Sequence, residues 1–208
     1  MLPFQHPTTI LVGGPTQCVK THFVWKVLMH KMIQPEPERI IWVYGEWQDS
    51  FDRYRILFPN IEFMQNFTWE TYNNLDRAKR NLVVLDDKMA EMADDPLLGD
   101  LFTKGSHHKN LTVMFLVQNV YHKGKYMRTA SLNSHYIVAF KNARDTSQFG
   151  VLARQANQRK AKVLQRVFEE ATSTPHGYLL MDFHPNSSDE YRTRTNIFPD
   201  EKVVVYEF

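Results

Sequence analysis

The stretch Thr8–Phe23 constrains the fold of this chain more than any other. It reads TTILVGGPTQCVKTHF, in which a β-favouring run leads into a double glycine, a short loop and a lysine–threonine pair. A helical pattern of apolar residues follows. Backbone N–H groups at a helix N-terminus attract anions, while the lysine and threonine of such a loop bind outer phosphates and Mg²⁺. The stretch therefore predicts a phosphate-binding P-loop, whose nucleotide-binding residues are Gly14, Pro15, Thr16, Gln17, Cys18, Val19, Lys20 and Thr21.

One position departs from the P-loop pattern G-x-x-x-x-G-K-S/T. Val19 occupies the place of the second glycine, whereas Gly14, Lys20 and Thr21 fit. Glycine lets the backbone approach a phosphate closely, but a β-branched residue is stiff and tolerates unusual backbone angles badly. We therefore expect an ATP site that is weakened but real. The alternative is a simple strand–turn–helix junction with a chance Lys-Thr pair.

Composition sets the class of protein. The 208 residues include 43% hydrophobic and 23% charged residues, which predicts one globular domain spanning residues 1–208. A net charge of +2 gives no argument for a nucleic-acid partner, so any basic surface has to be local. The single cysteine excludes a disulfide within the chain and a cysteine-based zinc site, and it fits a reducing compartment. No apolar run approaches the roughly 18 residues of a membrane span and no signal peptide is recognisable, so we expect an intracellular protein without a membrane partner.

Strand-like and helix-like segments alternate along most of the chain. We expect strands over 9–12, 39–44, 61–64, 81–87, 112–117, 135–140, 178–183 and within 202–208. We expect helices over 20–33, 47–58, 68–79, 145–155 and 159–171, a helical or loop region over 90–103, and a polar, basic segment over 120–134. This alternation predicts an α/β fold with a mainly parallel central sheet flanked by helices on both faces.

Two of these strands end in polar side chains suited to nucleotide chemistry. The run NLVVLDD ends in Asp86 and Asp87, and the run TVMFLV is followed by Gln118. Open α/β sheets bind ligands at the carboxyl ends of their strands. Our hypothesis is that Asp86 binds the metal through water, Asp87 is the catalytic base, and the Gln118 amide holds the attacking water or the γ-phosphate. The alternatives are solvated acids that cap the next helix and a polar turn at a strand end.

Four segments resemble a known family, and together they cover about residues 4–200: FQHPTTILVGGPTQCVKT, NLVVLDDKM, LFTKGSHHKNLTVMFLVQN and SLNSHYIVAFKNARDTSQFGVLARQ. They resemble the genome-packaging ATPases of the FtsK–HerA superfamily, in the branch of Maverick/Polinton-type elements and related eukaryotic DNA viruses. The resemblance implies a P-loop NTPase with a RecA-like ASCE core, ATP and Mg²⁺ as ligands, and a homo-oligomeric ring. It also implies a translocase that moves double-stranded DNA into a capsid, and hence capsid proteins as partners. The expected location is the host cell nucleus or cytoplasm, or the virion.

The same resemblance implies roles for individual residues. Lys20 and Thr21 would contact the nucleotide and Mg²⁺, Asp86 and Asp87 would form the acidic pair, and Gln118 would be the sensor. An arginine supplied across the subunit interface would neutralise transition-state charge. By position after the run HYIVAF, Arg144 fits this role best, followed by Arg128 and then Arg154.

A packaging motor has to hold DNA without reading its sequence, so Lys and Arg contacts to phosphates are expected. We favour Lys123 and Lys125, because Gly124 between them indicates a flexible loop just after the sensor strand. Lys104 and Lys109 are the next candidates. A third basic group, around 159–162, fits a solvated helix surface better.

Three other classes of protein compete with the motor. The first is a catalytically impaired P-loop homologue that serves as a DNA-binding or structural ring subunit, with Val19 as its signature. The second is a nucleotide kinase, which would need an arginine-rich lid and a nucleoside-monophosphate pocket. The third is a helicase, for whose accessory segments 208 residues leave little room.

Overall fold

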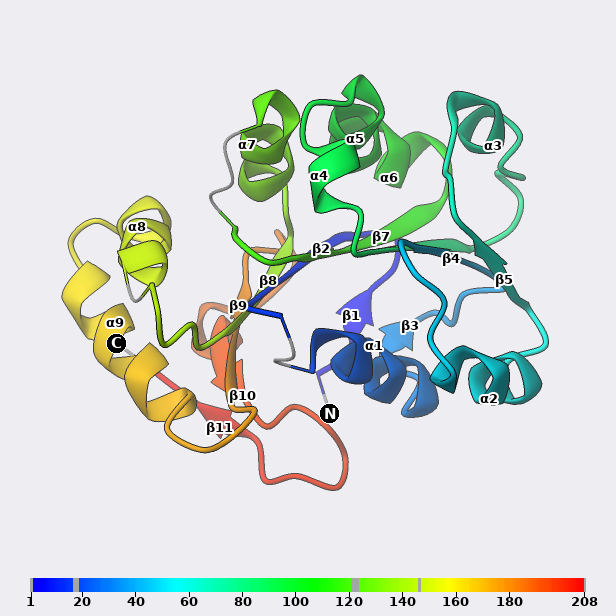
Figure 1. Ribbon diagram of the computed structural model, residues 1–208. Helices are drawn as coiled ribbons and strands as arrows, with labels where there is room; N and C mark the ends of the chain where they lie inside the picture. The colour runs from blue at the N-terminus through cyan, green and yellow to red at the C-terminus, as the bar shows by residue number, and fades with distance from the viewer. Residues whose placement is uncertain (1, 17–18, 121–123, 146, 208) are drawn as a thin grey trace.

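The computed structural model describes residues 2–16, 19–120, 124–145 and 147–207 (Figure 1). Its strands are β1 (Phe4–Gln5), β2 (Thr9–Gly13), β3 (Ile33–Gln34), β4 (Arg39–Tyr44), β5 (Ile61–Met64), β6 (Asn81–Asp86), β7 (Leu111–Val117), β8 (Tyr136–Phe140), β9 (Tyr178–Asp182), β10 (Thr193–Thr195) and β11 (Val204–Val205). Its α-helices are α1 (Lys20–Met29), α2 (Ser50–Leu57), α3 (Trp69–Asn73), α4 (Met89–Met92), α5 (Pro96–Asp100), α6 (Ser106–His108), α7 (Lys125–Leu132), α8 (Ser147–Ala156) and α9 (Ala161–Ala171). The chain also forms a π-helical turn (Leu101–Gly105) and a 3₁₀ turn (Asp189–Tyr191).

The core of the fold is a nine-stranded sheet in the order β11-β10-β9-β8-β2-β7-β6-β4-β5. All pairings from β8 to β5 are parallel, whereas β9, β10 and β11 continue the sheet in antiparallel fashion. Helices α3 to α7 lie on one side of the sheet and α1 and α2 on the other, while α8 and α9 lie beside the part of the sheet where the antiparallel strands begin, and α9 contacts β9 (Figure 1). The predicted α/β fold with a mainly parallel sheet is confirmed.

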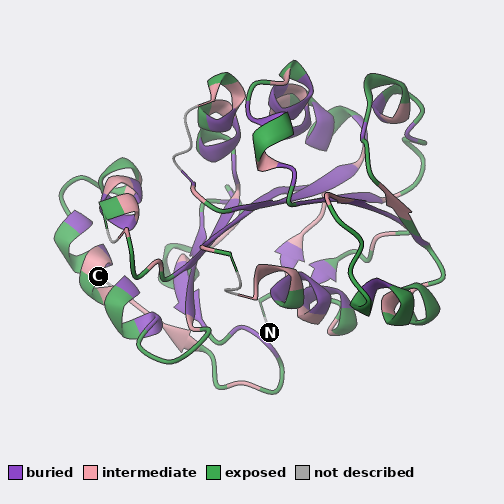
Figure 2. Ribbon diagram, in the orientation of Figure 1, coloured by how far each residue is buried: buried purple, intermediate pink, exposed green. Residues whose placement is uncertain are grey.

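Both faces of the central strands are buried, which explains their continuous apolar sequences. In β2, Leu11 packs into the core under α5 and α7, while Ile10 and Val12 pack into the core over α1 and α2. Figure 2 shows the sheet as a buried layer between helices with exposed outer faces. Successive residues of a strand point to opposite faces, so helices on both sides require apolar residues at every position.

Three sequence predictions differ from the structure. The helix expected over 68–79 ends at Asn73, because the Asn81 side-chain amide binds the carbonyls of Asp76 and Lys79 and holds the segment before β6 in turns. The helix expected over 20–33 ends at Met29, and the short strand β3 then pairs with β1. The flexible loop expected around Lys125 is instead the first turn of α7.

The antiparallel end of the sheet contains a buried ion pair. The guanidinium of Arg194 in β10 donates to Asp182 Oδ2 in β9 over 3.0 Å, and both side chains are almost fully buried.

Among the residues that the structure describes, no helix is long and apolar enough to cross a bilayer.

Candidate functional site

The parallel register of three neighbouring strands brings the predicted site residues to one edge of the sheet. Strand β7 lies between β2 and β6, and its last residue, Val117, is paired with Gly13 at the end of β2. On its other side Phe115 is paired with Leu85 of β6. The three strands therefore end at the same edge of the sheet, and this brings the P-loop, Gln118 and Asp86 close together.

The P-loop contains a strained residue. Val19, at the N-cap position of α1, has φ 64° and ψ 25°, the left-handed conformation that a β-branched side chain rarely adopts. Its carbonyl accepts the Phe23 N–H over 2.9 Å, and its half-buried side chain packs against the apolar core on the α1 side of the sheet. The backbone shape that glycine would allow is thus retained, at a cost of about 1–3 kcal/mol.

Lys20 and Thr21 point their polar atoms toward the loop and the neighbouring strand. Lys20 Nζ donates to the carbonyl oxygens of Gly14 (2.7 Å) and Pro15 (2.9 Å), so the ammonium lies against the P-loop. Thr21 Oγ1 donates to Asp86 Oδ2 over 3.1 Å, which joins α1 to the end of β6. A phosphate could replace the two carbonyls as the partner of the lysine without moving the helix.

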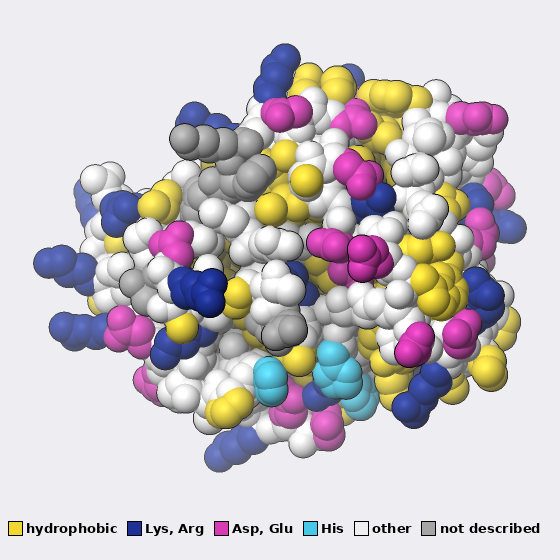
Figure 3. All heavy atoms as spheres, viewed as in Figure 1, with side chains coloured by type: hydrophobic (Ala, Val, Ile, Leu, Met, Phe, Trp, Pro, Cys, Tyr) yellow, Lys and Arg dark blue, Asp and Glu magenta, His cyan; other side chains and the backbone are white. Residues whose placement is uncertain are grey.

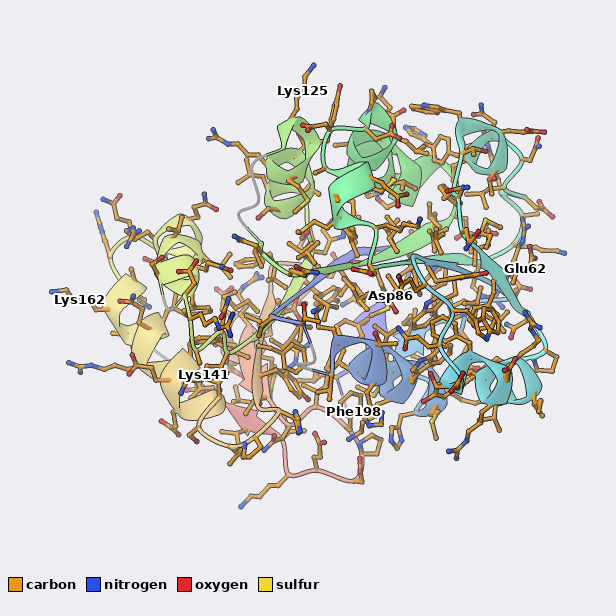
Figure 4. All side chains as sticks on the ribbon, in the orientation of Figure 1. Glu62, Asp86, Lys125, Lys141, Lys162 and Phe198 are labelled. Atoms are coloured by element: carbon orange, nitrogen blue, oxygen red, sulfur yellow. The ribbon has the colours of Figure 1, made fainter. Side chains whose placement is uncertain are left out.

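Asp86 is the buried acid of the site. Its residue is only 6% exposed, and Figure 4 shows it near the middle of the molecule, close to α1. Desolvation raises the pKa of Asp86 to about 6, although the Thr21 hydrogen bond and the charge of Lys20 act in the opposite direction. A buried carboxylate beside a hydroxyl suits a hard cation such as Mg²⁺, which binds few protein oxygens and completes its shell with phosphates and water. Thr21 and Asp86 therefore fit Mg²⁺.

Asp87 and Gln118 lie in the same cleft as these residues. Asp87 is exposed with φ 56°, and Gly45 makes room for it, because a Cβ at Gly45 would lie 3.2 Å from Asp87 Oδ2. The cleft has a volume of about 500 Å³ and is lined by P-loop residues together with Asp86, Asp87 and Gln118. The structure thus brings together the lysine, the hydroxyl, both acids and the Gln118 amide that were assigned to nucleotide chemistry from the sequence.

The far wall of the cleft contains residues that the sequence did not single out. Gln48, Ser50 and Tyr54 come from the segment after β4, and Trp25 comes from α1. Trp25 stacks on Tyr54 with ring centroids 3.6 Å apart and an interplanar angle of 9°. Their neighbourhood depends on the packing of α2 against α1, so no local sequence signal marks it.

A second groove of about 590 Å³ lies on the other flank of the P-loop. Thr16 and Gln118 line both the groove and the cleft, so the two are contiguous. Exposed Arg144 lines the rim of the groove, close to the P-loop of its own chain. Arg128 lies on the exposed side of α7, and Arg154 is exposed on α8.

The predicted DNA-binding lysines lie in different settings. Lys125 is exposed at the start of α7, and Lys104 is exposed and forms an ion pair with Asp100 at 3.7 Å. Lys109 is buried: its Nζ donates to the Asn73 carbonyl over 3.2 Å. The predicted contact of Lys109 with DNA does not fit this burial, because its ammonium is turned into the protein. Gln17, Cys18 and Lys123 lie outside the residues that the structure describes.

Comparisons with solved structures identify the fold. The genome packaging NTPase B204 from Sulfolobus turreted icosahedral virus 2, in complex with sulfate, aligns with a TM-score of 0.61 and 11% identity over 100% of this chain and 98% of that chain. The same protein in complex with ATP-gammaS aligns with a TM-score of 0.58 and 12% identity over 97% of both chains. Flagellar accessory protein FlaH from Methanocaldococcus jannaschii aligns with a TM-score of 0.52 and 10% identity over 99% of this chain and 92% of that chain.

No protein-family model matches the sequence, and no curated protein sequence matches it. At identities of 10–12% the structural likeness shows the fold and not the activity. The fold is that of RecA-like P-loop NTPases, as the family resemblance implied.

The strain at Val19 generates a prediction for nucleotide affinity. Val19→Gly should tighten ATP binding by at most the strain of about 1–3 kcal/mol, because a glycine loop can adjust its backbone N–H groups to the phosphates without steric cost, whereas the Val19 loop is held by its packed side chain. Val19→Ala keeps a Cβ in that conformation but removes the branching, and should give an intermediate affinity. ATP affinity would be measured for these variants, wild type and Lys20→Ala side by side. Equal affinities of wild type and Val19→Gly would show that the valine is harmless, and a glycine variant no better than Lys20→Ala would exclude a nucleotide cradle.

The burial of Asp86 generates a prediction for stability. The rise of its pKa from 3.8 to about 6 corresponds to at most about 3 kcal/mol against folding once the carboxylate is ionised. Both states are protonated below about pH 4, so the cost appears between about pH 4 and 6 and is complete above that range. Asp86→Asn should therefore raise the free energy of unfolding at pH 8, with a smaller gain at pH 5, as measured by urea titration without nucleotide.

An exposed acid away from the site provides the control for this experiment. Glu169→Gln, on α9, should change the free energy of unfolding by less than about 0.5 kcal/mol at either pH. An Asp86→Asn variant less stable than wild type at pH 8 would contradict the assignment of Asp86 as a desolvated carboxylate.

Proposed function

We propose that the chain is an ATPase that drives the translocation of double-stranded DNA and packages viral or transposon DNA into a capsid. The observation that carries the proposal is the bond between Thr21 of the P-loop and buried Asp86 of a separate strand, with Gln118 in the same cleft. Packaging is supported by the sequence resemblance over about residues 4–200 and by the likeness in fold to a protein named a genome packaging NTPase.

In this proposal each polar group of the cleft has one task. Lys20 exchanges its carbonyl partners for the outer phosphates of ATP. Thr21 and Asp86 would hold Mg²⁺, which would neutralise charge on the phosphates. Asp87 is the base that accepts a proton from the attacking water. Gln118 orients that water or the γ-phosphate, because its amide both donates and accepts hydrogen bonds.

The DNA and capsid partners, and a location in the host nucleus or cytoplasm or in the virion, are parts of the same proposal. Lys125 and Lys104 are the exposed lysines proposed to contact DNA phosphates, together with Lys123. Figure 3 shows further Lys and Arg side chains gathered on the side of the molecule formed by α8 and α9. Positive charge is thus local in a chain whose net charge is only +2.

The left-handed backbone at Val19 favours one alternative. A catalytically impaired homologue, retained as a DNA-binding or structural ring subunit, would keep the fold and lose turnover. It differs from the motor in hydrolysis and not in shape.

The proposal is tested by ATP hydrolysis of the purified chain with Mg²⁺, with and without duplex DNA. We expect hydrolysis that duplexes of any sequence stimulate and that Lys20→Ala abolishes. Lys202→Ala, which removes an exposed lysine near the C-terminal end, is the matched control and should leave hydrolysis unchanged. Lys20-dependent ATP binding without turnover would favour the impaired subunit, and the absence of Lys20-dependent binding would exclude both.

The proposed ring generates a prediction for Arg144. If this arginine acts on the nucleotide of a neighbouring subunit, Arg144→Ala should leave ATP affinity nearly intact and lower turnover by about 10³-fold or more. Hydrolysis would be measured in mixtures of wild-type and variant subunits at constant total protein. Each variant subunit should then reduce activity by more than its share. A strictly proportional loss would place Arg144 in its own subunit's site, which it also borders.

A further inference from the structure

The groove beside the P-loop is lined by an unusual set of side chains. Four carboxamides, those of Gln118, Asn119, Asn142 and Gln148, border it together with Arg144, Ala143 and the P-loop residues Pro15 and Thr16. None of these lining side chains is an acid. The acids and the lysine that handle phosphates and Mg²⁺ border the cleft on the other flank.

The two flanks of the P-loop therefore differ in chemistry. A nucleoside triphosphate is a linear molecule, so a γ-phosphate held beside Asp86 and Gln118 directs the nucleoside toward the opposite flank. The groove begins there, since it shares Thr16 and Gln118 with the cleft. Its volume of about 590 Å³ lies within the usual range for pockets that bind small molecules.

Existing hydrogen bonds orient two of the carboxamides. Gln148 Nε2 donates to Asp145 Oδ2 over 2.8 Å, so the Oε1 branch of this amide is the acceptor on offer. Asn142 Oδ1 accepts the Arg144 backbone N–H over 3.0 Å, so the Nδ2 branch of that amide is the donor on offer. Asp145 also accepts from the Ser147 N–H and hydroxyl, which anchors it at the start of α8.

A small, partly apolar cavity adjoins these amides. Asn142 and Gln148 also line this cavity of about 30 Å³, whose other walls include Val120, Phe140 and Phe149. The cavity is too small for a nucleobase, so a flat heteroaromatic ring would lie in the groove itself, where the carboxamides can form hydrogen bonds with its edge.

We propose that this groove is the nucleobase subsite of the ATP site and that Asn142 and Gln148 select adenine. Adenine presents an amino donor beside ring-nitrogen acceptors, which match the Gln148 oxygen and the Asn142 amide N–H. Guanine presents an oxygen where adenine has the amino group, so two acceptors would face each other. This inference rests on the proposed function, because it assumes that the triphosphate binds at the P-loop.

The test compares the affinities of Mg²⁺ complexes of ATP, GTP and inorganic triphosphate. Wild type should bind ATP about ten- to hundredfold more tightly than GTP, and more tightly than triphosphate. Gln148→Met keeps the length of the side chain without its hydrogen-bonding groups, and should bring the ATP and GTP affinities together. Asn142→Ala should weaken ATP binding about tenfold or more. Both variants should leave triphosphate affinity unchanged within about threefold, which also shows that the P-loop remains folded.

Gln65→Ala, which removes an exposed amide at the β5 edge of the sheet, is the control and should change none of the three affinities. Equal wild-type affinities for ATP and GTP, or for ATP and triphosphate, would overturn the subsite. If triphosphate binding still depended on Lys20, the phosphate-binding part of the proposed function would stand. Equal losses of ATP and triphosphate binding in the Asn142 and Gln148 variants would also overturn it, since these side chains would then act through the P-loop. The absence of Lys20-dependent triphosphate binding would overturn both proposals.

Discussion

The parallel register of β2, β7 and β6 is the constraint on which the candidate site depends. Thr21 and Asp86 are 65 residues apart in the sequence, and their hydrogen bond exists only because these strands end at the same edge. The register is strongly specified, because all three strands are buried along their whole length and a slip of one residue would exchange the two faces of a strand. The geometry of the site therefore depends directly on the packing of the core. A change that disturbs the pairing of β7 moves the P-loop, Asp86 and Gln118 together.

What the sequence could predict follows from this coupling. The strand over 39–44 has the predicted bounds, because its nearly continuous apolar run reports directly on burial between two layers of helices. The edge strand over 61–64 also has the predicted bounds, although Glu62 within it is exposed. Asp86 and Gln118 were placed at one site because the carboxyl ends of parallel strands converge. The sequence could not predict the stacking of Tyr54 on Trp25 or the groove with its oriented amides. Both depend on how the helices pack against the sheet. A lysine in a basic segment similarly does not reveal whether its ammonium faces solvent.

The segments whose secondary structure was not predicted show where local sequence patterns fail. Residues 120–134 are polar and basic overall, yet α7 buries Met127 and Ala130 on one face, which is enough to fix a short helix. Strand β10 has only three residues, too few for a period to be visible, whereas β11 lies within the predicted range 202–208. The attachment of β10 to the sheet depends on tertiary contacts such as the buried pair of Arg194 with Asp182. Removing one partner of such a pair would leave an uncompensated buried charge, so the fold depends on both residues. Because the two residues lie in different segments, the pattern of one segment does not predict the contact.

Two features of the site oppose folding in the protein without ligand. Val19 adopts a backbone conformation that its side chain disfavours, and Asp86 is buried beside an acidic neighbour with a raised pKa. Natural sequences agree with their folds at most positions, and conflicts tend to gather where a ligand is bound. At Val19 the conflict is offset in part by the packing of the side chain against the core on the α1 side, a contact that glycine could not make. The loop thus holds its shape through burial, where the usual P-loop relies on the freedom of glycine. A cation and phosphates would relieve the second conflict by giving the Asp86 carboxylate a partner. The two deviations from good folding chemistry therefore lie within one cleft, on the residues that a nucleotide and its metal would contact.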